Sequence, residues 1–108
     1  MSVLEQIAAE FGVDADELTI WVERHWVMPL RSGMEFQFTD ADRARLRMIV
    51  EFRRDLAIDD EAMPVVLDLV DRLHAARAQL HDVLEALADL PEADRAIVIR
   101  RLGQGEKT

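Results

Sequence analysis

Several features that would point to particular chemistries are missing from this sequence. It contains no cysteine, which excludes disulfides, thiolate metal sites and thiol redox switches. No apolar run approaches the roughly 18 residues that a membrane-spanning helix needs. The stretch Met1–Glu5 has neither the basic region nor the cleavage site of a secretory signal. We therefore expect a cytoplasmic protein without a membrane segment.

Signatures of catalysis are also missing. The sequence has no glycine-rich phosphate loop, no serine-centred nucleophile elbow and no His-Glu metalloprotease motif. His74 and His81 would lie about 10.5 Å apart along a helix, too far to share one zinc ion. The acids Asp59–Glu61 suit the positive end of a helix macrodipole. We expect no enzymatic activity, no metal and no cofactor.

Basic residues are scarce, and most of all near the start of the chain. The 13 Lys and Arg stand against 22 Asp and Glu, which gives a net charge of −9. Residues 1–38 hold seven acids but only Arg24 and Arg31 as bases, a net charge of −5. DNA-binding proteins gain affinity by neutralising phosphates with Lys and Arg. This segment is better suited to a basic protein surface.

What is present describes a folded, mostly helical protein. Half of the 108 residues are hydrophobic and 32% are charged, the balance of a soluble domain. Ser2, followed by Glu5, predicts the start of a first helix that ends at Gly12. Asp14 is expected to cap a second helix that runs to about His25.

A wing is expected to follow these two helices. Pro29 cannot continue a helix, and Arg31–Gly33 supplies turn residues. The stretches Trp26–Met28 and Met34–Phe38 then predict two short strands. We expect the aromatic side chains to build the core of the head, although one exposed tryptophan would suit a protein contact; they are Trp21, Trp26, Phe36 and Phe38.

A third helix begins with Thr39 as its cap and carries the one basic concentration in the chain. Acids lie among its arginines, so we expect ion pairs within the helix and a solvated face more than a phosphate track. With this helix, the winged helix-turn-helix-like head spans residues 1–58. The arginines are Arg43, Arg45, Arg47, Arg53 and Arg54.

A long helix is predicted over residues 59–90, with Pro64 inside its first turns. Its apolar residues recur in steps of three and four, as in a coiled coil. A helix of this length spans roughly 45 Å, so we expect a second copy to cover the seam in an antiparallel homodimer. The alternative is that the seam folds back on the head of the same chain. The seam is formed by Val66, Leu69, Leu73, Ala76, Leu80, Val83, Leu87 and Leu90.

Beyond the seam we expect a short C-terminal helix over residues 91–103. Pro91 suits its start, and Gly103 is expected to end it. An apolar set that includes Ile97 and Ile99 would pack over the end of a partner's seam. Residues 104–108 are expected to form a frayed tail.

The ordered pattern of the first half resembles the head of MerR-type regulators. Over about residues 3–90 the chain is more similar to the chaperone modulators of the CbpM type, through the junction and the helix that follow. The resemblance implies a mostly α fold, with a MerR-like winged helix-turn-helix head, a long coiled-coil dimerisation helix and a short C-terminal helix. It is carried by Phe11-Gly12-Val13, Leu18 to Glu23, Met28-Pro29-Leu30-Arg31, Phe36 to Asp42, Leu46-Arg47-Met48-Ile49, Phe52 to Asp59 and Val65 to Leu73.

The two related groups differ in the function that they imply. MerR-type regulators carry basic residues in the second helix, where this chain has acids. The chaperone modulators bind the J-domain of a DnaJ-like co-chaperone and block its action on Hsp70. We therefore expect a masking protein, for which DNA is an unlikely partner; the candidate J-domain-binding residues are Asp14, Asp16, Glu17 and Glu23.

Two other functions remain open. One is a MerR-like dimeric transcriptional regulator that binds a palindromic operator, with the second helix in the major groove. The other is a dimeric adaptor without any link to chaperones. Salt-sensitive binding to promoter DNA would distinguish the first of these from a J-domain binder.

Overall fold

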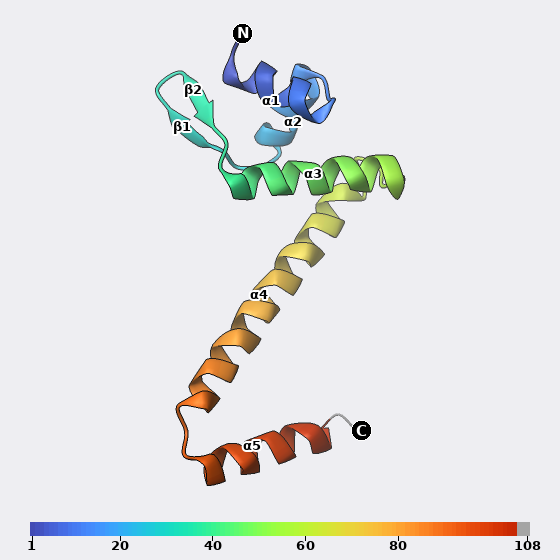
Figure 1. The fold of residues 1–108 in the computed structure, drawn as a ribbon. Helices are drawn as coiled ribbons and strands as arrows, with labels where there is room; N and C mark the ends of the chain where they lie inside the picture. The colour runs from blue at the N-terminus through green and yellow to red at the C-terminus, as the bar shows by residue number, and fades with distance from the viewer. Residues whose placement is uncertain (106–108) are drawn as a thin grey trace. The chain divides into compact units, whose positions relative to one another are not determined.

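The structure is a computed structural model that describes residues 1–105. It confirms a mostly helical fold with one two-stranded sheet (Figure 1). The chain divides into two compact units, Met1–Leu67 and the residues from Asp68 onward. The elements are α1 (Val3–Phe11), α2 (Ala15–Glu23), β1 (Leu30–Ser32), β2 (Glu35–Gln37), α3 (Asp40–Asp55), α4 (Met63–Ala88) and α5 (Glu92–Gly105).

The caps of α1 follow the predicted pattern. The side chain of Ser2 accepts a hydrogen bond from the backbone N–H of Glu5 at 3.1 Å. Gly12 has a φ of 71°, the left-handed conformation that ends many helices and that glycine adopts without a steric penalty. At the start of α2, Asp14 occupies the predicted cap position, but its side chain accepts no hydrogen bond from the helix backbone.

The end of α2 lies two residues before the predicted one. The helix ends at Glu23, and His25 adopts a φ of 61°. His25 N–H donates to the carbonyl of Val22 and Trp26 N–H to that of Trp21, at 3.1 and 2.9 Å. This hydrogen-bond pair is a Schellman motif, which normally uses glycine in the left-handed position. It stacks the rings of Trp21 and Trp26, with centroids 6.0 Å apart.

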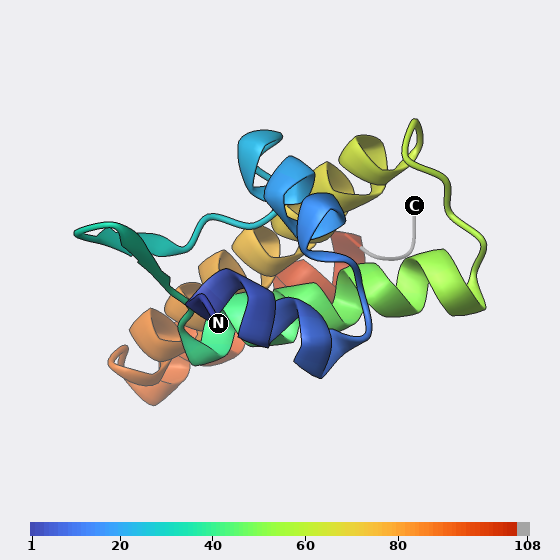
Figure 2. The same cartoon turned by 90° about the horizontal axis from the view of Figure 1, so that it is seen from above.

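The wing is present, but its first strand lies further along the chain than predicted. β1 pairs antiparallel with β2, and Arg31 stands opposite Phe36. The stretch Trp26–Met28 is not a strand, because the cap of α2 turns Trp26 and Val27 into the core, where they are 3% and 0% exposed. The two-residue turn begins at Gly33, whose φ is 65°, as hairpin turns require. Figures 1 and 2 show the hairpin tip beyond the helices of the first unit.

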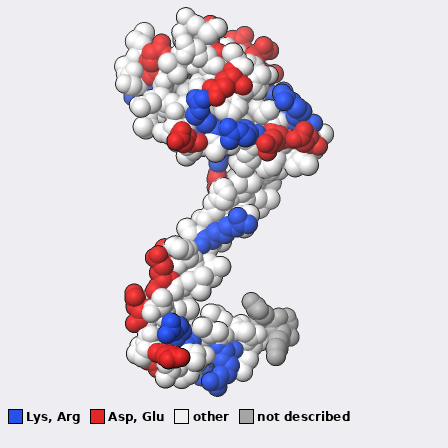
Figure 3. Space-filling model, viewed as in Figure 1, with Lys and Arg blue, Asp and Glu red and all other residues white. Residues whose placement is uncertain are grey.

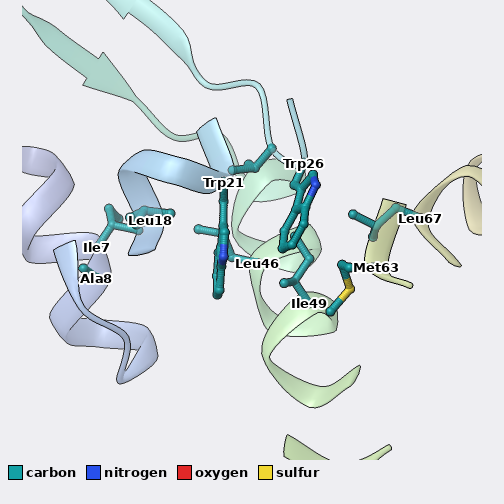
Figure 4. Close-up of a cluster of buried hydrophobic side chains, with 10 residues drawn as sticks. Ile7, Ala8, Leu18, Trp21, Trp26, Leu46, Ile49, Met63 and Leu67 are labelled. Carbon is teal, nitrogen blue, oxygen red and sulfur yellow. The ribbon is translucent and has the colours of Figure 1, made fainter. Parts of the chain in front are cut away.

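The core of the first unit draws on every helix of that unit (Figure 4). The predicted core position of Phe36 is wrong: its ring is half-exposed, contacts Phe38 edge to face and has the guanidinium of Arg31 5.0 Å from its centroid. Phe38 is only partly buried against the core. The buried residues are Ile7, Ala8, Leu18, Trp21, Trp26, Val27, Leu46, Ile49, Met63 and Leu67.

α3 starts as predicted. Thr39 accepts a hydrogen bond from the N–H of Asp42 at 3.1 Å, and the side chain of Asp42 accepts one from the N–H of Thr39 at 2.9 Å. This reciprocal capping box satisfies two backbone donors at the helix start.

α4 starts later than predicted, at Met63 rather than near residue 59 or 60. A helix from Asp60 would need an N–H on residue 64 to reach the carbonyl of Asp60, and proline has none. Asp59 instead closes a turn, because its side chain accepts a hydrogen bond from the N–H of Ala62 at 2.8 Å. The first turn of α4 belongs to the first unit, whose core includes Met63 and Leu67.

Most of the predicted seam on α4 is open to solvent in the single chain. Leu69, Leu73, Leu80 and Val83 are 58%, 48%, 59% and 49% exposed. Leu87 differs, since it is buried, whereas Ala76 and Leu90 are exposed and Val66 is half-buried. α4 has 26 residues and a length of about 39 Å. Its exposed apolar face is therefore long.

The C-terminal helix follows Pro91, as predicted, but does not end at Gly103. α5 continues through Gly103 to Gly105, and Gly103 does not adopt the left-handed conformation with which Gly12 ends α1. Residues 104 and 105, expected in the frayed tail, are therefore helical, and the rest of the predicted tail, residues 106–108, lies outside the described residues. Ile97 and Ile99 are exposed.

Within the described residues, no helix has both the length and the apolar character that crossing a bilayer requires. No group of three or more histidines and acids lies close enough to hold a metal ion in this part of the chain. His81 pairs with Glu85, four residues further along α4, at 3.1 Å.

Candidate partner-binding surface

The outward face of α2 is the candidate partner-binding surface. Leu18 and Trp21 lie on the buried face, 0% and 2% exposed. A turn of 100° per residue places the exposed positions on the opposite side of the helix. We call this surface the acidic stripe; it consists of Asp16, Thr19, Ile20 and Glu23, all exposed.

The stripe combines charge with an apolar centre. Asp16 and Glu23 are seven residues apart, so their side chains leave the same face of the helix about 10.5 Å apart along its axis. Ile20 lies between them and is 43% exposed. The side chain of Thr19 donates to the carbonyl of Ala15 at 2.9 Å and so faces its own helix. α2 contains no Lys or Arg.

The four predicted site residues do not form one surface. Asp16 and Glu23 belong to the stripe, and Asp14 is exposed just before the helix starts. Glu17 is turned toward α3, where its carboxylate accepts a hydrogen bond from Arg53 at 2.9 Å. Glu17 is therefore a contact within the fold, and Ile20 is a surface residue that sequence reasoning missed. Its signal was present, since Leu18 and Trp21 define the buried face and Ile20 lies opposite.

The arginines of α3 are largely used inside the first unit. Arg43 forms an ion pair with Glu10 of α1, and Arg53 forms one with Glu17 of α2. Arg45 donates to the carbonyl of Trp26. The sequence predicted ion pairs within α3 and did not predict these contacts. A rule based on residue spacing along one helix cannot identify partners on other elements. On the face seen in Figure 3, blue and red side chains lie next to each other across the head.

Two of these arginines also cover aromatic rings. The guanidinium of Arg53 lies 5.4 Å from the ring centroid of Trp21, and that of Arg47 lies 6.0 Å from that of Phe11. The hydrogen bond with Glu17 raises the pKa of Arg53, against a smaller lowering by burial. Arg53 is thus a cation between α2 and α3 whose charge is neutralised by Glu17.

The wing contacts α1 through a carboxylate. Glu35 of β2 accepts a hydrogen bond from the backbone N–H of Val3 at 3.0 Å. The N–H groups of the first helical turn lack partners within the helix, and a carboxylate there also complements the helix dipole. Glu35 therefore ties the wing to α1.

Comparison with known proteins identifies the architecture. The model of the MerR HTH family of regulatory proteins matches residues 3–85, more than three quarters of the chain. Comparisons with curated proteins and with solved structures give no significant match. The matched range includes both helices of the helix-turn-helix, the wing, α3 and most of α4. The chain belongs to the MerR HTH family of regulatory proteins.

Proposed function

We propose that this protein is a chaperone modulator, which binds the J-domain of a DnaJ-like co-chaperone and masks the surface that the J-domain offers to Hsp70. The acidic stripe carries the proposal. α2 is the helix that a helix-turn-helix protein places in the major groove, and here it exposes Asp16 and Glu23 without a single base. A phosphate backbone would repel this face, whereas a basic protein helix would attract it.

The stripe suits a helical partner. Bases two turns apart on that partner would meet Asp16 and Glu23, about 10.5 Å apart along α2. Ile20, 43% exposed between the two carboxylates, offers an apolar contact from which water is excluded on binding. The resemblance to CbpM-type proteins implies such a partner, the basic helix that a J-domain presents to Hsp70. Masking would work by occupancy alone, without a chemical step.

We include an antiparallel homodimer in this proposal. Leu73 and Leu80 are about half exposed on α4, and pairing two such seams would remove a continuous apolar surface from water. Each dimer would then carry two acidic stripes and bind two J-domains.

Binding of a purified J-domain, measured by calorimetry at low and moderate salt, tests the proposal. The charge-reversed variant D16K/E23K should weaken binding at least about tenfold, since complementary charge becomes repulsive at two points. The matched control is E51K/D55K, which makes the same change in net charge at two exposed positions on α3. Equal affinity for the wild type and D16K/E23K would reject the acidic stripe as the binding face.

A gel shift with promoter DNA distinguishes the main alternative, a MerR-like DNA-binding regulator. If the stripe faces a protein, the wild type should not shift DNA even at low salt. Specific, salt-sensitive retardation by the wild type, together with no J-domain binding, would replace the chaperone proposal with the regulator.

A further inference from the structure

A small cleft in the first unit lies between the turn that joins α1 to α2 and the last turns of α3. Its volume is about 270 Å³, just below the range of roughly 300–1,000 Å³ that is usual for sites of drug-sized ligands. The cleft is therefore large enough for a compact small molecule but not for a typical drug-sized ligand. The lining residues are Gly12, Val13, Glu17, Val50, Arg53 and Arg54.

The cleft has an apolar part and a cationic part. Val13 and Val50 are half-buried and pack against the core of the unit. Arg53 is already paired with Glu17 at 2.9 Å, so these two charges cancel within the cleft. Arg54 has no acidic partner within ion-pair distance among the described residues. The cleft thus carries one uncompensated positive charge, although residues 1–58 hold eleven acids and only seven bases.

Backbone geometry keeps Arg54 accessible from the cleft. A Cβ on Gly12 would lie 3.7 Å from Nη2 of Arg54, so the guanidinium lies beside the open α-carbon of the glycine. The N–H groups of Gly12 and Val13 are bound to the carbonyls of Ala9 and Ala8. They are not free to hold an anion, which leaves the guanidinium of Arg54 as the group that would receive one.

From this arrangement we propose that the cleft is a binding site for a small organic monocarboxylate. The carboxylate accepts a forked pair of hydrogen bonds from Arg54, and a compact apolar body, one ring or a short branched chain, lies over Val13 and Val50. A single free charge in an acidic head favours a monoanion over a nucleotide or another polyanion. The inference is independent of the J-domain, because the cleft lies on the side of α2 that carries Glu17 and not on the acidic stripe.

Titration of the full chain with sodium benzoate, followed by two-dimensional amide NMR, tests this site. We expect saturable shifts at Gly12, Val13, Val50 and Arg54, and none with benzamide, which has the same shape without the charge. R54Q should weaken binding about tenfold, the effect of losing one charge-assisted contact. R54K should fall between the two, because lysine keeps the charge but loses the fork.

The control is R47Q, which removes the same charge from the same face of α3 two turns earlier. It should bind benzoate as the wild type does. Shifts that grow linearly without saturation, or an equal loss in R47Q and R54Q, would overturn the site in favour of general attraction of anions. Inorganic phosphate that produces the same shifts at the same concentrations would overturn the assignment to an organic monocarboxylate.

Discussion

At the scale of single residues, His25 occupies a position that glycine usually fills. Its φ of 61° is sterically unfavourable for a residue with a Cβ. The conformation allows the Schellman hydrogen bonds and the stacking of Trp21 on Trp26. The sequence predicted the glycine cap at Gly12, because residue type alone signals it. It did not predict the cap at His25, because there the burial of Trp26 determines the backbone.

The substitution H25G should therefore stabilise the protein. His25 is exposed, so its side chain adds little packing, and glycine removes a strain of roughly 1 kcal/mol. We expect a rise of about that size in the free energy of unfolding, measured with urea. The control is R24G, one residue earlier at a φ of −83°, which should destabilise because it relieves no strain, adds freedom to the unfolded chain and removes the contact of Arg24 with the ring of Trp26. A lower urea midpoint for H25G would contradict the prediction.

The pair Glu17 and Arg53 allows a second prediction at this scale. Their side chains are 40% and 35% exposed, and ion pairs with such access to water couple by less than about 1 kcal/mol. A double-mutant cycle of E17Q and R53Q should return a coupling of that size. R53Q alone should cost more than E17Q alone, because it also loses the contact with the ring of Trp21. Equal losses in the two single variants would mean that the ring contact contributes nothing.

At the scale of elements, the starts of α1 and α3 were predicted best and the strands worst. Ser2 and Thr39 act within three residues of their own helix, so local pattern suffices. β1 was misplaced, because Trp26–Met28 has the composition of a strand but lies where the end of α2 turns inward. The acidic stripe was half predicted: Asp16 and Glu23 were named for their charge, while Ile20 was missed because the prediction used charge alone and not the position of Ile20 opposite the buried Leu18 and Trp21.

The contact between the wing and α1 depends on Glu35, and E35A should loosen it. The lost hydrogen bond to Val3 at 3.0 Å and the lost interaction with the helix dipole together should cost about 0.5–1 kcal/mol. We expect faster hydrogen exchange of the amides of α1 and the hairpin, with exchange in α3 unchanged. Q37A, on the same strand, is the control. Equal exchange rates in wild type and E35A would show that the wing is held by other contacts.

At the scale of the whole molecule, the main question is what covers the apolar surface of α4. The spacing of the seam was predicted from sequence, and α4 shows most of it exposed in the single chain. Leu87 is the exception, since it is buried within its own chain. A repeat of three and four identifies the face of a helix but not the surface that covers it, so the antiparallel homodimer stays a prediction.

That prediction can be tested by a charge in the seam. L80D places a carboxylate at a position where a second copy would exclude water, and an unpaired buried charge costs several kcal/mol. In sedimentation at micromolar concentration, the wild type should be a dimer and L80D a monomer. A78D is the control, because Ala78 lies on the opposite face of the helix from the seam. A wild type that sediments as a monomer, or an L80D dimer, would mean that no second copy covers these leucines.

The distance between two spin labels, one on each copy, would give the orientation of the helices in the dimer. A single introduced cysteine can be labelled specifically, because the chain has no cysteine of its own. The seam from Val66 to Leu90 is centred near residue 78, so an antiparallel pair brings the middle of each helix together and separates the ends. Labels on A88C would then lie 20 residues apart along the axis, about 30 Å. A parallel pair would hold them within roughly 10–20 Å, because paired helices run only 8–10 Å apart. A short distance would therefore reverse the proposed orientation, because only a parallel pair keeps the same residue of both helices side by side.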